Sequence, residues 1–220
     1  MSLPADYWPL LAADYLTGYA LAFPSAGGIA SEPSHRNAII IAMSVAEHET
    51  NNGRAWPGTN NFGAVQLRTL TPNELASFQA GTLKAGDYNA AHDGVLHVDT
   101  HPPGIPYPVW FAAFPTRAEG IWRYLQTLWR LSAGRADFTD ATCADVVKEM
   151  YLHGYFEGFH PGARPVGKRT LPLTPPEQAN VDDYTGAVQK CRDMIEPQLD
   201  SWDYGRDQNV PTVDPGRTVA

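Results

Sequence analysis

The sequence is poor in cysteine and in positive charge. Only two of its 220 residues are cysteines, Cys143 and Cys191. Both fall in helical patterns, so two reduced thiols are expected rather than a disulfide. Lysine and arginine number 16 against 24 acidic residues, which gives a net charge of −8. This balance argues against nucleic acid as a partner, because nucleic-acid binding needs clustered basic residues. It also argues against purely electrostatic adhesion to anionic wall polymers.

The sequence also lacks a long apolar run and a recognisable leader. No uninterrupted apolar stretch approaches the ~20 residues that a membrane-spanning helix needs. Residues 1–15 have no basic leader followed by an apolar core and a small-residue cleavage site, so they do not resemble a secretory signal. We therefore expect no membrane span and synthesis in the cytoplasm without a signal peptide. If the protein acts on a cell wall, another route has to deliver it.

What is present indicates a globular chain with a large core. Hydrophobic residues make up 43% of the sequence, and tryptophan, tyrosine and phenylalanine together make up 11%. Such an aromatic content suits a protein that offers flat apolar surfaces to a ligand. The length fits one domain, which we assign to residues 1–202, followed by an extended tail over residues 203–220 that lacks periodicity.

The patterns along the chain predict an α+β fold in which helices predominate. Apolar residues at helical spacing predict helices over residues 3–23, from Ser34 to Glu49, over 116–134 and 142–153, and again up to Ile195. Residues 64–114 differ, since short apolar–polar alternations are split there by glycine and proline clusters. They predict a small irregular β-lobe, with a short helix near residues 71–79 in which Pro72 suits the first turn.

Glu49 stands at the end of the helix that begins near Ser34. On a helical wheel it shares its side with apolar residues, whereas Glu47 projects the opposite way and is interpreted as a surface or helix-terminal charge. A carboxylate at the end of an apolar stripe is costly to bury ionised, so the pKa of Glu49 should rise. Enzymes use this device to keep a general acid protonated near neutral pH. The alternative is a frayed last turn whose glutamate points into water.

Several motifs in order resemble one known family. The helix ends in Glu49-Thr50-Asn51-Asn52-Gly53, and a loop with Asn60-Asn61-Phe62-Gly63 follows. The run from Phe111 to Ile121 and the segment Gly154-Tyr155 look like the next two family motifs, and the entry to the last helix, Asn180 to Tyr184, resembles a further one. Over about residues 30–195 the chain is similar to the bacterial endo-β-N-acetylglucosaminidases of the autolysin and flagellar-hydrolase type, within the lysozyme-like superfamily. It differs in a longer, proline-rich interval from Phe159 to Pro176.

The resemblance implies a lysozyme-like helical domain that cleaves β-1,4 bonds between N-acetylglucosamine and N-acetylmuramic acid in peptidoglycan, with no cofactor. Glu49 would protonate the glycosidic oxygen, and Tyr155 would position the sugar or polarise an attacking water. Asp99 is favoured as the second carboxylate, with Asp87 and Asp93 as alternatives. Its separation from the acid would set the stereochemical outcome, at roughly 5–5.5 Å for retention and roughly 6.5–9.5 Å for inversion. If no carboxylate faces Glu49, the substrate's acetamido group or a lytic transglycosylase route must serve.

Six polar and aromatic residues are candidates for substrate binding. The amides of Asn60, Asn61 and Gln66 suit sugar hydroxyls and acetamido groups, and the rings of Trp56, Phe62 and Trp110 suit sugar faces. Each of these aromatic residues is also compatible with plain packing. The expected partners are peptidoglycan glycan strands.

Two alternatives come from other classes of protein. The pattern His97-Val98-Asp99-Thr100-His101 would place two imidazoles and a carboxylate on one face of a strand, a ligand set that suits the zinc ion of a wall amidase or peptidase. The chain could also be a non-catalytic structural or wall-binding module of a virion, which contacts other virion proteins through its C-terminal tail. The missing leader and acidic balance motivate the related hypothesis that the enzyme is a bacteriophage endolysin or a virion-associated wall hydrolase.

Overall fold

A computed structural model describes residues 3–4, 6–22, 33–55, 58–89, 94–101, 105–130 and 141–200. The helices are α1 (Tyr7–Ala22), α2 (Pro33–Thr50), α3 (Pro72–Gln79), α4 (Arg117–Arg130), α5 (Cys143–Leu152) and α6 (Pro175–Ile195), with a 3₁₀ turn over Glu196–Leu199. The strands are β1 (Gln66–Thr69), β2 (Tyr88–Asn89), β3 (Gly94–His101) and β4 (Ile105–Ala112). The predicted α+β class is confirmed. None of the described helices is long and apolar enough to cross a membrane. The expected tail lies outside the described residues.

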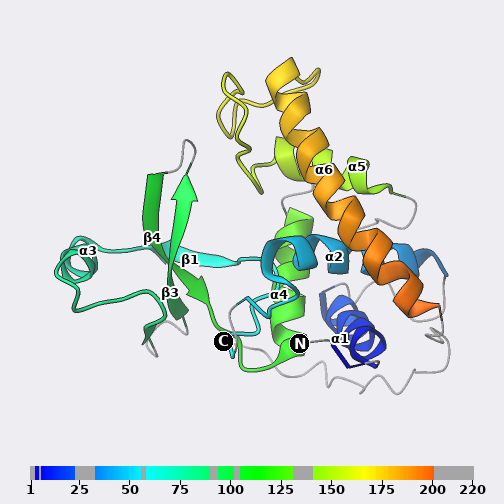
Figure 1. The fold of residues 1–220 in the computed structure, drawn as a ribbon, viewed down its shortest axis with the longest axis horizontal. Coiled ribbons are helices and arrows are strands. Elements are labelled where there is room, and N and C mark those ends of the chain that lie inside the picture. Colours follow the sequence, from blue (N-terminus) through cyan, green and yellow to red (C-terminus); the bar gives the residue numbers. More distant parts are fainter. Residues whose placement is uncertain are drawn as a thin grey trace.

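Helix α2 lies at the centre of a helical body (Figure 1). It packs mainly against α6, while α1 packs against α4 and α5 against α6. Every side chain from Ala38 to Ala46 is buried, on all sides of the helix. A helix that is apolar all round belongs in a protein interior. The helical wheel predicted one apolar face for this helix, but its other faces are buried as well. Cys143 and Cys191 are both free thiols, in line with the expectation.

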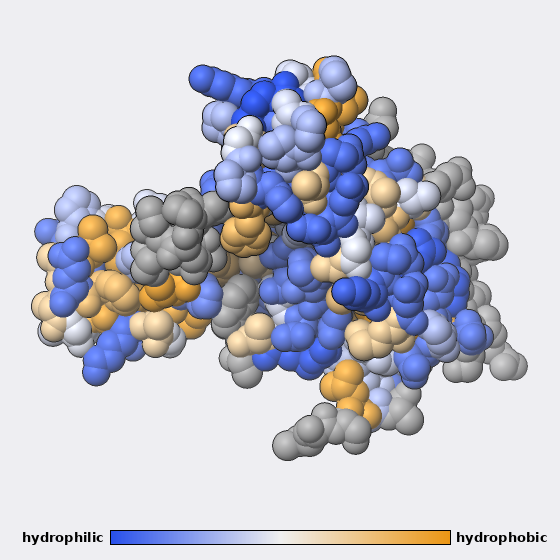
Figure 2. All heavy atoms as spheres, turned by 45° about the horizontal axis from the view of Figure 1, so that its top comes forward, coloured by the Kyte–Doolittle hydropathy of each residue, from blue (hydrophilic) through white to orange (hydrophobic). Residues whose placement is uncertain are grey.

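The β-lobe is a four-stranded antiparallel sheet with strand order β1-β4-β3-β2. Its central pair runs from Gly94 opposite Ala112 to His101 opposite Ile105. Helix α3 begins where the sequence predicted, with Pro72 in its first turn, because the Thr71 hydroxyl accepts from the Glu74 backbone N–H. The lobe projects from the helical body and carries exposed apolar side chains, among them Leu67 and Leu75 (Figure 2).

The proline-rich loop between α5 and α6 is organised by two arginines. The guanidinium of Arg169 is buried, lies over the ring of Tyr151 at 3.9 Å and donates to the carbonyls of Tyr151, Phe156 and Glu157 at 2.7–3.0 Å. Burial lowers the pKa of Arg169. Arg164 pairs with Glu177, whose side chain is 0% exposed, at 2.5 Å. The interval that departs from the family pattern is thus fixed to α5 and α6 by side-chain contacts.

The Arg164–Glu177 pair should make stability depend on acid. Hydrogen bonds from Arg164, with that from the Thr174 N–H, lower the pKa of Glu177 from 4.5 to about 2. A depressed carboxyl pKa contributes stability above the unfolded value that is lost as pH falls toward the folded one. We expect Glu177→Gln to cost ~3 kcal/mol at pH 7, as for a broken buried pair, and the difference from the parent to shrink between pH 4.5 and 2. Urea unfolding at pH 7, 4 and 2.5 measures this. A difference in unfolding free energy between parent and variant that stays constant with pH would contradict a lowered pKa of Glu177.

Candidate functional site

Glu49 lies in the last turn of α2. The chain continues from this end of α2 toward the lobe (Figure 1). The side chain of Glu49 is half-buried. The hydroxyl of Tyr184, on α6, donates a hydrogen bond to Oε1 of Glu49. The carboxylate is therefore held between two helices rather than left in a frayed turn. The alternative in which Glu49 simply points into water does not describe this geometry.

Two further phenols lie close enough to feel the charge of Glu49. Burial raises the pKa of Tyr124 and Tyr155 well above that of an ordinary phenol, and the carboxylate of Glu49 raises it further. The same two causes, in the same order, raise the pKa of Tyr184. All three phenols therefore stay protonated through the neutral range. Tyr184 donates to Glu49 itself, whereas the hydroxyls of Tyr124 and Tyr155 donate to the backbone carbonyls of Ala42 and Gly63 at 2.9 and 3.3 Å.

The ring of Tyr184 is fixed on both sides. Phe156 stacks on it with centroids 4.1 Å apart and planes 14° from parallel, and His48 meets it edge-on at 4.7 Å. His48 thus contacts the residue that binds Glu49. Burial lowers the pKa of His48, so its imidazole is neutral near pH 7 and adds no positive charge there.

Thr50 ties the loop after α2 to the end of that helix. Its buried hydroxyl donates to the carbonyl of Phe62 at 2.8 Å and accepts from the N–H of Gly53 at 2.8 Å. One small hydroxyl side chain therefore fixes both ends of the loop that follows Glu49. This contact gives a physical reason for the Glu-Thr-x-x-Gly spacing.

The two asparagines of the next motif join the loop to the rest of the protein. Asn61 is fully buried, and its Nδ2 donates to the carbonyls of Val65 and Ala112 at 3.1 and 3.0 Å. The Nδ2 of Asn60 donates to the carbonyl of Phe114 at 2.8 Å. Both N–H groups of the Asn61 amide are therefore used within the protein, to attach the loop to β4 and to Val65. Sugar binding by Asn60 stays a prediction.

Glycine is required at two contacts around the same loop. A Cβ at Gly63 would lie 2.0 Å from the Tyr124 ring, and a Cβ at Gly120 would lie 1.8 Å from the carbonyl oxygen of Asn60. Both distances are far inside van der Waals contact. The loop therefore lies close against α4. The carbonyl of Gly63 also accepts from the hydroxyl of Tyr155 at 3.3 Å. Tyr155 is one of the phenols whose pKa the charge of Glu49 raises.

Glu47 lies in the last turn of α2, as the helix-terminal interpretation has it, but it is buried rather than on the surface. It is only 9% exposed; its Oε1 accepts from Arg54 at 2.5 Å and its Oε2 from Asn52 at 2.8 Å. Asn52 in turn accepts from the hydroxyl of Tyr15, on α1, at 2.8 Å. The reason for the difference is that α1 covers the face of α2 opposite Glu49. Glu47 thus belongs to a buried polar network that attaches the end of α2 to α1.

The predicted stacking residues that the structure describes are buried. Phe62 is 2% exposed, belongs to the main hydrophobic core and meets the ring of Tyr15 edge-on at 5.9 Å. Trp110 is 1% exposed on β4, in the lobe. Gln66 is exposed on β1 and donates to the hydroxyl of Tyr107 at 3.2 Å. Trp56 lies outside the described residues.

The second carboxylate stays a prediction. The backbone of Asp99 lies on β3 opposite Tyr107, but its side chain is outside the described part of the protein, as is all of Asp93. Asp87 is exposed and accepts from the backbone N–H of Lys84 at 2.7 Å, which is the geometry of an ordinary turn. Asp99 therefore remains the lobe carboxylate that we expect to act with Glu49.

The zinc alternative rests on three residues of β3. The ring of His97 meets Phe111 edge-on at 5.2 Å, while the side chains of Asp99 and His101 are outside the described part. The described residues contain no cluster of three or more His, Cys, Asp or Glu side chains suited to a metal ion.

Sequence reasoning missed the role of Tyr184 and of Thr50. Tyr184 was recognised only as part of an apolar stripe and of a family-like helix entry, and no local pattern connects it to a carboxylate 135 residues earlier. Thr50 was quoted in a motif without a role. The one signal available was that both residues fall in segments that resemble the family.

The chain matches no protein-family model, no curated protein and no solved structure.

Proposed function

We propose that the protein is a peptidoglycan glycoside hydrolase of lysozyme-like fold, in which Glu49 is the general acid. One observation carries the proposal: a half-buried glutamate, bound by a phenol, at the end of a buried helix from which the chain continues toward the β-lobe (Figure 1). The family resemblance supports the same residue independently of this geometry. The bond cleaved would be the β-1,4 link between N-acetylglucosamine and N-acetylmuramic acid.

The hydrogen bond from Tyr184 to Oε1 of Glu49 supports an assignment of roles to the two oxygens. In the proposed mechanism Oε1 accepts from the phenol, while Oε2 carries the proton and donates it to the glycosidic oxygen as the C–O bond breaks. Water activated by a second carboxylate, for which Asp99 is the candidate, would then complete hydrolysis. The acetamido group of the substrate is the alternative partner. In that case the acetamido oxygen attacks C1 as the protonated leaving group departs, and the resulting oxazolinium ion is opened by water to the reducing sugar or by the sugar's own 6-hydroxyl to a 1,6-anhydro sugar.

Removing the Tyr184 hydroxyl should change the pH dependence of activity. The phenol donates to Glu49, and such a bond favours the ionised carboxylate. In Tyr184→Phe the protonated acid therefore persists to higher pH. A hydrogen bond to a charged group contributes ~1.5 kcal/mol, and one pKa unit corresponds to ~1.4 kcal/mol, so the basic limb of the pH–rate profile should move up by about one unit. Tyr7→Phe, on α1, is the matched control, because its hydroxyl accepts from Arg54 rather than contacting Glu49. A basic limb that stays in place or moves down would contradict the geometry.

The assay that tests the proposal uses purified peptidoglycan and the full chain. We expect new reducing ends to appear, with no matching increase in free amino groups, and the rate to be unaffected by a chelator such as EDTA. Release of amino groups without reducing ends, abolished by EDTA and restored by Zn²⁺, would instead establish the amidase or peptidase alternative. Wall binding without release of reducing ends, amino groups or anhydro-sugar fragments would establish a non-catalytic module.

A further inference from the structure

A pocket lies in the lobe, between α3 and the sheet. Its volume is about 510 Å³, within the range of roughly 300–1,000 Å³ found for small-molecule sites. Helix α3 lies at the end of the lobe remote from α2 and Glu49 (Figure 1). The walls come from α3, from the turn after it, from β2 and from β4. The lining includes Asn73, Ser77, Thr82, Tyr88, Asn89 and Trp110. This pocket is separate from the Glu49 site.

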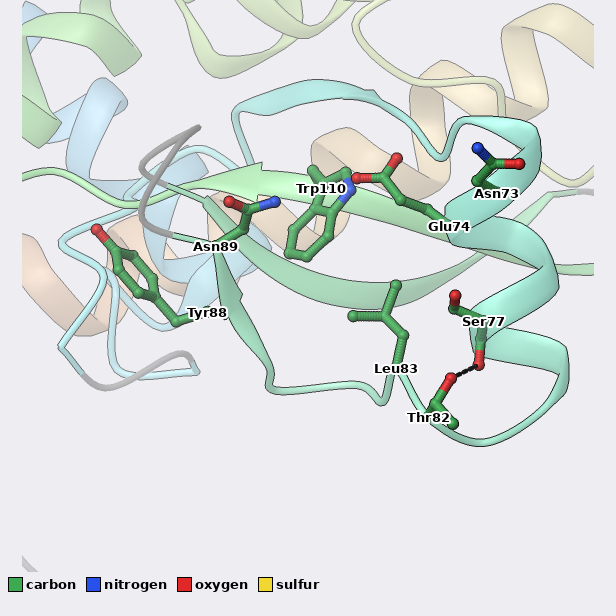
Figure 3. A pocket seen from close by; sticks show the side chains of 8 residues that line it. All are labelled: Asn73, Glu74, Ser77, Thr82, Leu83, Tyr88, Asn89 and Trp110. Carbon is green, nitrogen blue, oxygen red and sulfur yellow. Dashed lines mark hydrogen bonds between the residues drawn. The ribbon is translucent and has the colours of Figure 1, made fainter.

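Trp110 lines this pocket and carries a buried N–H donor that has no partner among the described residues. The residue is 1% exposed, and its Nε1–H has no hydrogen-bond partner among the described residues. Figure 3 shows the indole lying across the pocket with its nitrogen toward the α3 side. A buried donor without a partner costs ~1–3 kcal/mol, and the great majority of such groups in native proteins are satisfied. A ligand that supplies an acceptor oxygen would satisfy it.

The charges around the pocket select against an ionic ligand. Glu74 is the charged residue of the lining, and Arg68 binds both of its carboxylate oxygens at 2.7 and 2.8 Å. Thr71 donates to the same carboxylate through its N–H and its hydroxyl, both at 2.8 Å. The charge of Glu74 is therefore balanced within the protein. A charged ligand would find no opposite charge to pair with in this lining.

The remaining groups of the lining have the chemistry of a sugar site. Asn73 and Asn89 carry amides, Ser77 and Thr82 carry hydroxyls, and the ring of Tyr88, 57% exposed, stands beside them (Figure 3). Amides and hydroxyls match the donors and acceptors of a sugar, and a phenol ring offers an apolar face with a polar tip. A neutral, hydroxyl-rich ring that also carries a carbonyl acceptor fits this set best.

We infer that the lobe pocket binds a neutral N-acetylamino sugar unit, with an oxygen of the sugar accepting from Nε1 of Trp110. The inference rests on the proposed function for the identity of the sugar, and it adds a second attachment point for the glycan strand beyond the Glu49 site. The indole of Trp110 would thus bind the sugar by donating from Nε1, at the edge of the ring, and not by stacking with its face.

The test uses the trimer of N-acetylglucosamine as the probe and the Glu49→Gln full chain, which would leave the probe uncleaved. Tryptophan indole N–H resonances are followed by ¹H–¹⁵N NMR during titration. We expect a saturable shift of the Trp110 resonance, assigned with Trp110→Phe. The resonance of Trp122, whose Nε1 is also buried without a partner among the described residues, should not move, because Trp122 does not line the pocket.

Two variants of α3 make the test specific. Ser77→Tyr places a ring in the pocket and should reduce the affinity reported by Trp110 at least tenfold. Gln79→Tyr adds the same ring at an exposed position outside the lining and should leave the affinity unchanged. Because neither change removes a core side chain, the comparison remains valid even if Trp110→Phe fails to fold.

The outcomes separate this inference from the proposed function. Shifts near Gly63 and Tyr184 with a stationary Trp110 resonance would overturn the lobe site and leave the glycosidase proposal intact. A Trp110 shift that Ser77→Tyr does not weaken would also overturn it, since the probe would then act from elsewhere. Conversely, a specific Trp110 shift in a chain that releases no reducing ends from peptidoglycan would support sugar binding in the lobe and refute the glycosidase proposal.

Discussion

Replacing Glu49 with glutamine is expected to lower the rate of peptidoglycan cleavage by about a hundredfold to ten-thousandfold, the usual contribution of a general acid. Glutamine has nearly the same shape and can still accept at Oε1 from Tyr184, but its amide group cannot give up a proton to the glycosidic oxygen. The fold should therefore persist. Initial rates of reducing-end release, measured with thermal unfolding of the same samples, separate the chemical effect from a stability effect.

A variant that cleaves at the parental rate would remove Glu49 from the mechanism. A variant that loses activity only because it is unfolded at the assay temperature would say nothing in favour of the assignment. Assays are therefore run at least ten degrees below the unfolding midpoint of each variant, and the circular dichroism of Glu49→Gln should superimpose on that of the parent.

Glu47→Gln should have the opposite effects, a loss of stability with little change in the rate of cleavage. Glu47→Gln puts an amide NH₂ toward the donor groups of Asn52 or Arg54, and it leaves the Arg54 guanidinium without its counter-charge. Breaking a fully buried pair costs about 3–5 kcal/mol. Because the Arg54 side chain is 32% exposed, we expect ~2–3 kcal/mol here, which corresponds to a fall of roughly 5–10 °C in Tm for a chain of this size.

Well below that Tm, Glu47→Gln should cleave at close to the parental rate. Differential scanning calorimetry and the reducing-end assay, applied to both glutamine variants, form a matched pair. If Glu47→Gln kept its Tm and lost its activity while Glu49→Gln did the reverse, the roles of the two glutamates would have to be exchanged.

Local signals in the sequence predicted local structure well. Thr71, Pro72 and Glu74 specify the start of α3 because a helix cap is made by residues within one turn of each other. The alternation over residues 94–98 predicted a strand for the same reason, since the side-chain period of a strand is visible in a few residues. These elements depend little on what surrounds them.

Burial and contact could not be predicted in the same way. A helical wheel shows which residues share a face, but not that α1 covers the second face of α2, so the burial of Glu47 was not predicted. For Phe62 and Trp110 both stacking and packing were left open, because aromatic residues in loops and strands fit either role. The bond between Tyr184 and Glu49 joins helices far apart in the chain, and only the packing of α6 on α2 creates it.

The measurement that decides between glycan cleavage and its alternatives is mass spectrometry of the fragments that the parent chain and Glu49→Gln release from purified peptidoglycan in ¹⁸O-labelled water. We predict glycan fragments from the parent that end in a reducing amino sugar carrying one ¹⁸O, and at least a hundredfold less of them from Glu49→Gln. Equal yields from both proteins, or peptides released from intact glycan, would contradict a glycosidase that works through Glu49.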